Sequence, residues 1–384
     1  MMVGIDPRRC SGVYSFRGPE LSKASAKRLR PFGRAGFCSR SEYDPFAALL
    51  WVGRSGPFGG IIMFRAFTTI ILLLVLIDSA GVRMDSAVEK PPRIEGRVVY
   101  HSYMSYGDGR SALFVLSLGA GTLTNISRTW TNLVDPMNAH WSSDGKQIVF
   151  MARPRDERGA AGRFDVFLHT VGERGNPINL TNAPEADDED PKFSPDGRKI
   201  VYKVRPSTLR EMDVTSRVVN TIVTGGGWER SMPYYNADAS VVWFVQQRVG
   251  VKRGPASIRS INLNVPDERD VVEAPGGYYP IRDSVGHFLY LRWVSPENVH
   301  DQVFLYDGVT SRSLPFNSPD YDSSDAVPID ERYLALSSTR KGGAGGYDLY
   351  LADRSTGAMW SLSSYNSGVN TAREELGIAY TPIE

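Results

Sequence analysis

Residues 141–150 read WSSDGKQIVF, and residues 193–202 repeat them as FSPDGRKIVY. Weaker copies follow in residues 235–244, 282–291 and 329–336, so that successive copies start about 45 residues apart. In the two strong copies, Asp-Gly suits a tight hairpin turn, and the apolar run after it suits a buried strand. A period of this length built from short strands is typical of a β-propeller, in which each repeat is one four-stranded blade.

The chain can be divided into six such blades. Strand patterns fill five blades between residues 139 and 363, and three more strands precede them in residues 97–126. This first blade lacks its inner strand, whereas the strand-like residues 376–381 at the C-terminus belong to no blade. We therefore predict an all-β, six-bladed propeller over residues 88–384, closed where the C-terminal strand joins the first blade.

The repeat also carries a family resemblance. FSPDGRKIVY, together with the Gly-rich residues 340–353 that end in DLYLAD, resembles the TolB-type β-propeller repeat. The resemblance covers about residues 95–384 and implies a binding propeller of the cell envelope. The chain departs from TolB before the propeller, because residues 88–96 are too few to form the α/β domain that TolB has there.

Residues 63–87 have the pattern of a secretory signal peptide. Met63 and Arg65 precede the apolar residues 70–77, and small residues follow this run. The run is too short to span a bilayer comfortably, which favours a cleaved signal over the alternative, an uncleaved membrane anchor. We expect a periplasmic or secreted protein whose mature chain begins between Gly81 and Val88.

Residues 1–62 are basic and lack a sustained hydrophobic period. They hold ten Lys and Arg against four Asp and Glu. We interpret them as an over-extended reading frame, with a disordered basic arm as the alternative. Cys10 and Cys38 both lie here, so the propeller has no disulfide. Residues 88–384 carry 32 basic and 37 acidic side chains, and we expect a monomer without a nucleic-acid partner.

Carboxylates are frequent in the segments that should lead into the inner strands. In a propeller these segments ring one mouth of the central channel, where converging carboxylates would repel one another. Ca²⁺ takes six to eight oxygen ligands and would relieve this repulsion; a solvated rim, or pairing with arginine, is the alternative. The candidate Ca²⁺ ligands are Asp135, Asp188, Glu229, Asp322 and Glu374.

Aromatic side chains and arginines accompany these carboxylates. Aromatic faces stack on sugar rings beside polar groups that bind hydroxyls, and they are equally common in protein interfaces. The mouth is therefore predicted to bind a glycan or an envelope protein. The candidate ligand-binding residues are Trp228, Arg230, Tyr234, Tyr278, Tyr279, Tyr321 and Arg373.

The sequence contains no nucleophile elbow and no P-loop, which favours a non-catalytic binding protein. The alternative is a propeller enzyme acting on a polysaccharide, either a lyase or a glycosidase. A lyase needs a base, and a cation to neutralise the carboxylate of the uronic acid. His140, Tyr279, Arg230 and Arg282 are the candidates, although a structural role for His140 between blades is also open.

Overall fold

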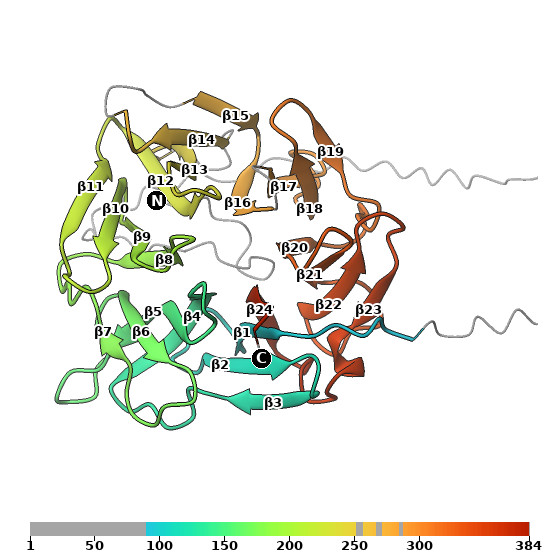
Figure 1. Cartoon of the computed structure of the whole chain (residues 1–384), viewed down its shortest axis with the longest axis horizontal. Helices are drawn as coiled ribbons and strands as arrows, with labels where there is room; N and C mark the ends of the chain where they lie inside the picture. The colour runs from blue at the N-terminus through green and yellow to red at the C-terminus, as the bar shows by residue number, and fades with distance from the viewer. Residues whose placement is uncertain (1–89, 251–255, 266–270, 284–286, 384) are drawn as a thin grey trace, which may run out of the picture. The chain divides into compact units, whose positions relative to one another are not determined.

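The computed structural model describes residues 90–250, 256–265, 271–283 and 287–383 (Figure 1). The interpretations of residues 1–62 and 63–87 concern segments that lie outside these residues. Across the described part of the chain, no helix combines the length and the apolar character that crossing a membrane requires.

Six four-stranded antiparallel sheets stand around a common centre as the blades of a propeller (Figure 1). This confirms the predicted fold class. Blades 1 to 3 consist, from the inner strand outward, of β24 Glu374–Thr381, β1 Arg97–Tyr103, β2 Ala112–Ser117 and β3 Thr122–Asn125; β4 Leu133–Trp141, β5 Gln147–Pro154, β6 Asp165–Thr170 and β7 Ile178–Asn179; and β8 Asp188–Phe193, β9 Lys199–Val204, β10 Thr208–Asp213 and β11 Val219–Val223.

Blades 4 to 6 repeat this order, and a short 3-10 helix, η1 Leu362–Ser364, follows the last outer strand. Their strands are β12 Trp228–Tyr235, β13 Val241–Arg248, β14 Ser257–Asn262 and β15 Val271–Pro275; β16 Tyr278–Arg282, β17 Phe288–Trp293, β18 Asp301–Tyr306 and β19 Ser311–Ser313; and β20 Ser323–Pro328, β21 Tyr333–Ser338, β22 Asp348–Asp353 and β23 Met359–Ser361.

The C-terminal strand closes the ring as predicted. β24 pairs antiparallel with β1, with Ala379 opposite Val99, and it is the inner strand of blade 1. Ile378 packs in the same buried apolar cluster as Tyr100 of β1. The indole Nε1 of Trp141 donates to the Ala379 carbonyl over 3.2 Å and so links β24 to blade 2. Closure therefore covers the edge of β1 that would otherwise be open.

The Asp-Gly pairs form the expected turns between inner and second strands. Asp144 Oδ1 accepts a 2.6 Å hydrogen bond from the Ser142 hydroxyl, while Gly145 has a φ of 66°. Asp196 and Gly197, with a φ of 72°, repeat this arrangement in blade 3. These conformations favour glycine, which has no Cβ to clash, so the motif is structural.

Each inner strand contains a residue in the left-handed region, with φ between 51° and 62°, and β4 contains a second one, Asp135. The pairing register with the second strand shifts at this position in every blade, which marks a β-bulge. The six bulge residues are Asn138, Asp190, Met232, Tyr279, Asp325 and Gly377.

The bulges correct one sequence-based expectation. The acidic segments were expected to be loops leading into the inner strands, yet pairing continues on both sides of each bulge. β4 thus begins at Leu133, whereas the sequence predicted its start at Ala139. Most of the residues assigned to a channel rim therefore belong to the strands themselves, where neighbouring strands and blades bury them.

Candidate functional site

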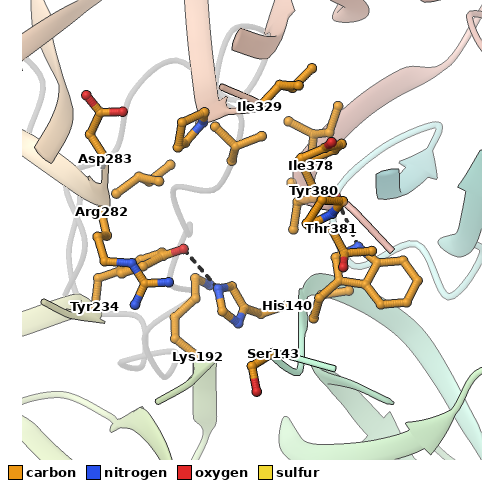
Figure 2. A pocket seen from close by; sticks show the side chains of 18 of the residues that line it. His140, Ser143, Lys192, Tyr234, Arg282, Asp283, Ile329, Ile378, Tyr380 and Thr381 are labelled. Carbon is orange, nitrogen blue, oxygen red and sulfur yellow. Dashed lines mark hydrogen bonds between the residues drawn. The ribbon is translucent and has the colours of Figure 1, made fainter. Parts of the chain in front are cut away.

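A cavity of about 560 Å³ occupies the central channel. All six inner strands contribute to its lining, from the bulge residues Asn138, Tyr279 and Gly377 to Ser143 and Asp330, at or beyond the ends of the inner strands. The cavity therefore lies in the half of the channel in which the inner strands end. Figure 2 shows Arg282, Tyr234 and His140 along one wall, with Ile378 and Tyr380 across from them.

His140 and Tyr234 form a hydrogen-bonded pair in this wall. The Nδ1 atom of His140 accepts from the Phe193 backbone N–H at 3.2 Å, and Nε2 lies 2.9 Å from the Tyr234 hydroxyl oxygen. Because Nδ1 accepts, the neutral ring carries its proton on Nε2 and donates it to Tyr234. The Tyr234 hydroxyl then keeps its own proton to donate, and the cavity lies beside it.

The imidazole of His140 stays neutral. Burial, with smaller effects from the positive charges of Lys192 and Arg282, holds its pKa well below the ordinary value. Lys192 is buried, and burial lowers the pKa of its ammonium group, although Asp190 and Asp325 act in the opposite direction. The guanidinium of Arg282 lies 5.9 Å from the ring centre of Tyr234.

A polar belt, made of Asn138, Asp190, Tyr279 and Asp325, crosses the channel at the level of the bulges. The Asn138 amide donates to Asp190 over 2.9 Å, and Asp325 accepts from the Gly377 backbone N–H over 2.9 Å. Tyr279 also hydrogen-bonds to Asp325. Burial raises the pKa of Asp325 to about 6. Asn138 and Tyr279 also line the cavity, so the belt borders the cavity on the side of the bulges, which we call its floor.

The five candidate Ca²⁺ ligands lie toward the other end of the channel, and four of them have a local partner. Asp188 is buried, and burial raises the pKa of its carboxyl to about 7. Among the described residues, no three His, Cys, Asp or Glu side chains come together as a group able to hold a metal ion. The partners are Arg153 for Asp135 at 2.9 Å, Gln247 for Glu229 at 3.3 Å, His300 for Asp322 at 3.2 Å, and the Tyr347 backbone N–H for Glu374 at 2.8 Å.

Two further groups of buried charges at this end were not singled out from the sequence. Glu189 lies 3.1 Å from the Lys203 ammonium and 2.8 Å from the Arg205 guanidinium, and its side chain is fully buried. Asp301 accepts from the Tyr278 hydroxyl, and its backbone N–H donates to Asp322 over 2.8 Å. Burial, with the nearby charge of Asp322, raises the pKa of Asp301 to about 8. These contacts hold blade elements together.

Of the candidate ligand-binding and lyase residues, His140, Tyr234, Tyr279 and Arg282 line the cavity. The others do not line it, and each has a partner elsewhere. Arg230 donates to the carbonyls of Ser207 and Gly225, Trp228 packs on Arg248, Tyr278 bonds to Asp301, Tyr321 donates to the Phe316 carbonyl, and Arg373 donates to the Arg110 carbonyl.

Sequence reasoning missed Lys192 as a cavity residue, although the repeat contains a signal for it. Lys192 precedes Phe193 in its copy as His140 precedes Trp141 and Tyr234 precedes Tyr235. The side chain one position before the repeat's aromatic residue therefore lines the cavity in three successive blades.

No protein-family model matches the sequence, and no curated protein matches it. Among solved structures, the chain is similar to Kuenenia stuttgartiensis hydrazine synthase, with 11% identity and a TM-score of 0.57 over 76% of this chain and 47% of that chain. It is also similar to a chain of a nidogen/laminin complex, with 7% identity and a TM-score of 0.51 over 75% of this chain and 100% of that chain. An oligogalacturonate lyase from Vibrio parahaemolyticus matches at 14% identity and a TM-score of 0.45, over 70% of this chain and 73% of that chain. At these identities the likeness shows the propeller fold alone.

Proposed function

We propose that this chain is an exported, non-catalytic propeller of the TolB type that binds the end of a glycan in its channel cavity. The observation that carries the proposal is the cavity itself, which has a volume of about 560 Å³ and is bordered on one side by Asn138 and Tyr279 of the polar belt. Sites for small molecules have volumes of about 300–1,000 Å³, and they place a few polar groups on largely apolar walls. The volume suits one or two sugar units.

The lining favours a sugar over a protein surface. Tyr380 and Trp141 provide aromatic rings in the walls, and the Tyr234 hydroxyl provides a donor within them. Rings of this kind pack on the apolar faces of sugars while polar groups bind the hydroxyls. A folded partner protein would instead need a broad surface of about 800 Å² on this chain, because standard interfaces bury that area per partner.

The bonding of the lyase candidates favours binding over catalysis. Both ring nitrogens of His140 are engaged, one by the Phe193 backbone and one by Tyr234. Burial, with the charge of Asp325, raises the pKa of Tyr279 well above its ordinary value. An efficient general base has a pKa near the working pH, so neither group is suited to remove a proton in this arrangement.

A block at the rim tests the proposal. Ser143 is exposed and lines the cavity, so Ser143→Trp should obstruct the cavity without disturbing a buried contact. We expect the full-length protein to bind members of a glycan array, and Ser143→Trp to weaken its tightest glycan at least tenfold, about 1.4 kcal/mol. Affinity would be measured by calorimetry and folding by circular dichroism.

Two control variants locate the site. Ser143→Ala leaves the rim open and should bind as the wild type does. Trp228 was predicted from the sequence to bind the ligand, but it does not line the cavity. Trp228→Ala should therefore also bind normally. Binding that survives Ser143→Trp but is lost in Trp228→Ala would overturn the assignment, and so would a failure of every glycan on the array to bind.

A further inference from the structure

Positive charge is concentrated in one corner of the cavity. Lys192 and Arg282 both lie close enough to His140 to lower the pKa of its imidazole, and no carboxylate contributes to that shift. The corner therefore differs from the rest of the channel, where acidic side chains are frequent. We define the cationic corner as Lys192, Arg282 and the His140–Tyr234 pair.

Three carboxylates line the cavity, those of Asp283, Asp330 and Glu331, and among the described residues none of them forms an ion pair with Lys192 or Arg282. Asp283 lines the cavity but forms a buried ion pair with Arg354, through contacts of 2.6 and 3.1 Å. Asp190 and Asp325 belong to the polar belt, where Asn138 and Gly377 donate to them. They attract the Lys192 ammonium from the floor side of the cavity. No described carboxylate forms an ion pair with Arg282.

Lys192 has donor capacity left for a ligand. Its side chain lines the cavity and its residue is only 9% exposed. Among the described residues, its ammonium makes one hydrogen bond, to the Pro191 carbonyl at 3.3 Å. An ammonium group carries three N–H donors, and burying them without partners is costly.

Arg282 also has unused donors. Its guanidinium makes one long hydrogen bond of 3.4 Å, to the Asn236 carbonyl, and lies near the Tyr234 ring. A guanidinium has five N–H donors in a planar fork that matches the two oxygens of a carboxylate. Figure 2 shows Arg282 beside Tyr234, with Lys192 and His140 next to them.

We infer that the sugar bound in this cavity is acidic, and that its carboxylate lies in the cationic corner between Arg282 and Lys192. This inference rests on the proposed function and adds the chemical class of the ligand. The carboxylate accepts from the guanidinium and the ammonium, while the Tyr234 hydroxyl donates to a neighbouring sugar oxygen. An uncharged sugar of the same shape leaves Arg282 without a counter-charge, and leaves Lys192 with only the carboxylates of the polar belt.

Binding of a carboxylate should also be visible at His140. An anion between the two cations offsets the charges that disfavour protonation of the imidazole, so the pKa of His140 rises on binding. The charged and titratable groups facing His140 are Lys192, Arg282 and Tyr234. A neutral sugar brings no such charge and leaves this pKa unchanged.

The test compares two disaccharides that differ only in the terminal sugar, glucuronate in one and glucose in the other. In calorimetry with the full-length protein, we expect the acidic disaccharide to bind at least tenfold more tightly. Arg282→Met should abolish the difference, and nuclear magnetic resonance of the wild type should show the rise in the His140 pKa only with the acidic probe. Arg248→Met, an exposed arginine at the other end of the channel, is the matched control and should keep the difference.

Lys192→Met is a second variant that should reduce the preference for the acidic disaccharide. Its melting temperature is measured in parallel, because Asp190 and Asp325 lose a nearby cation in this variant. Equal affinity for the two disaccharides would overturn the acidic ligand and leave the proposed glycan function intact. Failure of both probes and of all other glycans would instead overturn the proposed function. Binding of a peptide through its C-terminal carboxylate, with no sugar bound, would overturn the sugar and keep only the cationic corner.

Discussion

At the end of the channel where the inner strands begin, charged side chains are buried against each other. Glu189 of β8 is held by Lys203 and Arg205, and Asp135 of β4 by Arg153. Toward the end where the inner strands finish, Lys192 and Arg282 border an open cavity, and neither forms an ion pair with a described residue. Both ends are rich in ionisable groups, and those of the second end border the cavity of about 560 Å³.

The two ends of the channel show how a charged side chain that stabilises the fold differs from one that can contact a ligand. Glu189 and Lys203 are directly opposite each other in the pairing of β8 with β9, so their attraction stabilises one blade. A carboxylate that is paired and fully buried in this way is not accessible to a ligand. The cationic side chains of the cavity are instead contributed by different blades, and their remaining donors are the ones available to a ligand.

We expect the largest effect from removing a buried charge at the end of the channel where the inner strands begin, which we call the structural end. Glu189→Ala removes the carboxylate beside Lys203, whose side chain is fully buried, and leaves that ammonium without its counter-charge. We expect a loss of about 3–5 kcal/mol in the free energy of unfolding, measured by urea denaturation. Arg163→Ala, which removes an exposed partner of Asp187, is the control and should cost less than about 1 kcal/mol. Equal losses would contradict the structural role of Glu189.

The Asp301 carboxyl should make the structural end sensitive to pH. Its pKa is raised to about 8, mainly by burial and then by Asp322, whereas an aspartate in the unfolded chain ionises near pH 4. Between about pH 4 and 8 the unfolded state loses this proton and the folded state keeps it, so this group's contribution to stability falls as the pH rises.

Asp301→Asn removes this titration while keeping the shape of the side chain. Urea denaturation at pH 5 and pH 8 should show a smaller decline in the variant than in the wild type. An identical decline in both proteins would show that Asp301 is already ionised in the folded protein at pH 5.

The next effect concerns the cavity wall. Tyr234→Phe removes the hydroxyl that accepts from His140 Nε2, and leaves this buried donor without its partner. We expect a loss of about 1–2 kcal/mol in the free energy of unfolding, together with weaker glycan binding. Tyr321→Phe, which removes a hydroxyl that donates to the Phe316 carbonyl, is the matched control and should leave binding unchanged. Full glycan affinity in Tyr234→Phe would remove this hydroxyl from the site.

The smallest effect should be that of calcium. The sequence placed a Ca²⁺ site at the end where the inner strands begin, but four of the five candidate ligands have a partner there, and the described residues bring no three such side chains together. We therefore expect the same melting temperature in Ca²⁺, in Mg²⁺ and in chelator. A rise specific to Ca²⁺ would show that these carboxylates exchange their partners for the ion, and would restore the prediction made from the sequence.

Local patterns were sufficient to predict the architecture. The Asp-Gly turn at Asp144 and its copy at Asp196 each mark one blade. Such a turn can be predicted because its conformation depends on residues that are adjacent in the chain. The unpaired strand at each end of the propeller predicted closure, and β24 does pair with β1. Of the candidate residues chosen from the sequence, His140, Tyr234, Tyr279 and Arg282 line the channel cavity.

Only the tertiary structure decided which charged side chains line the channel cavity and which are buried against other groups. The bulge in each inner strand changes which side chains face the axis, so Lys192 lines the cavity while Glu189, three residues earlier, is buried against β9. Arg230 was expected at a binding surface, but carbonyls of an adjacent segment engage it. Whether a charged group binds a ligand depends on partners from other strands and blades, and the spacing of residues along one chain does not contain that information.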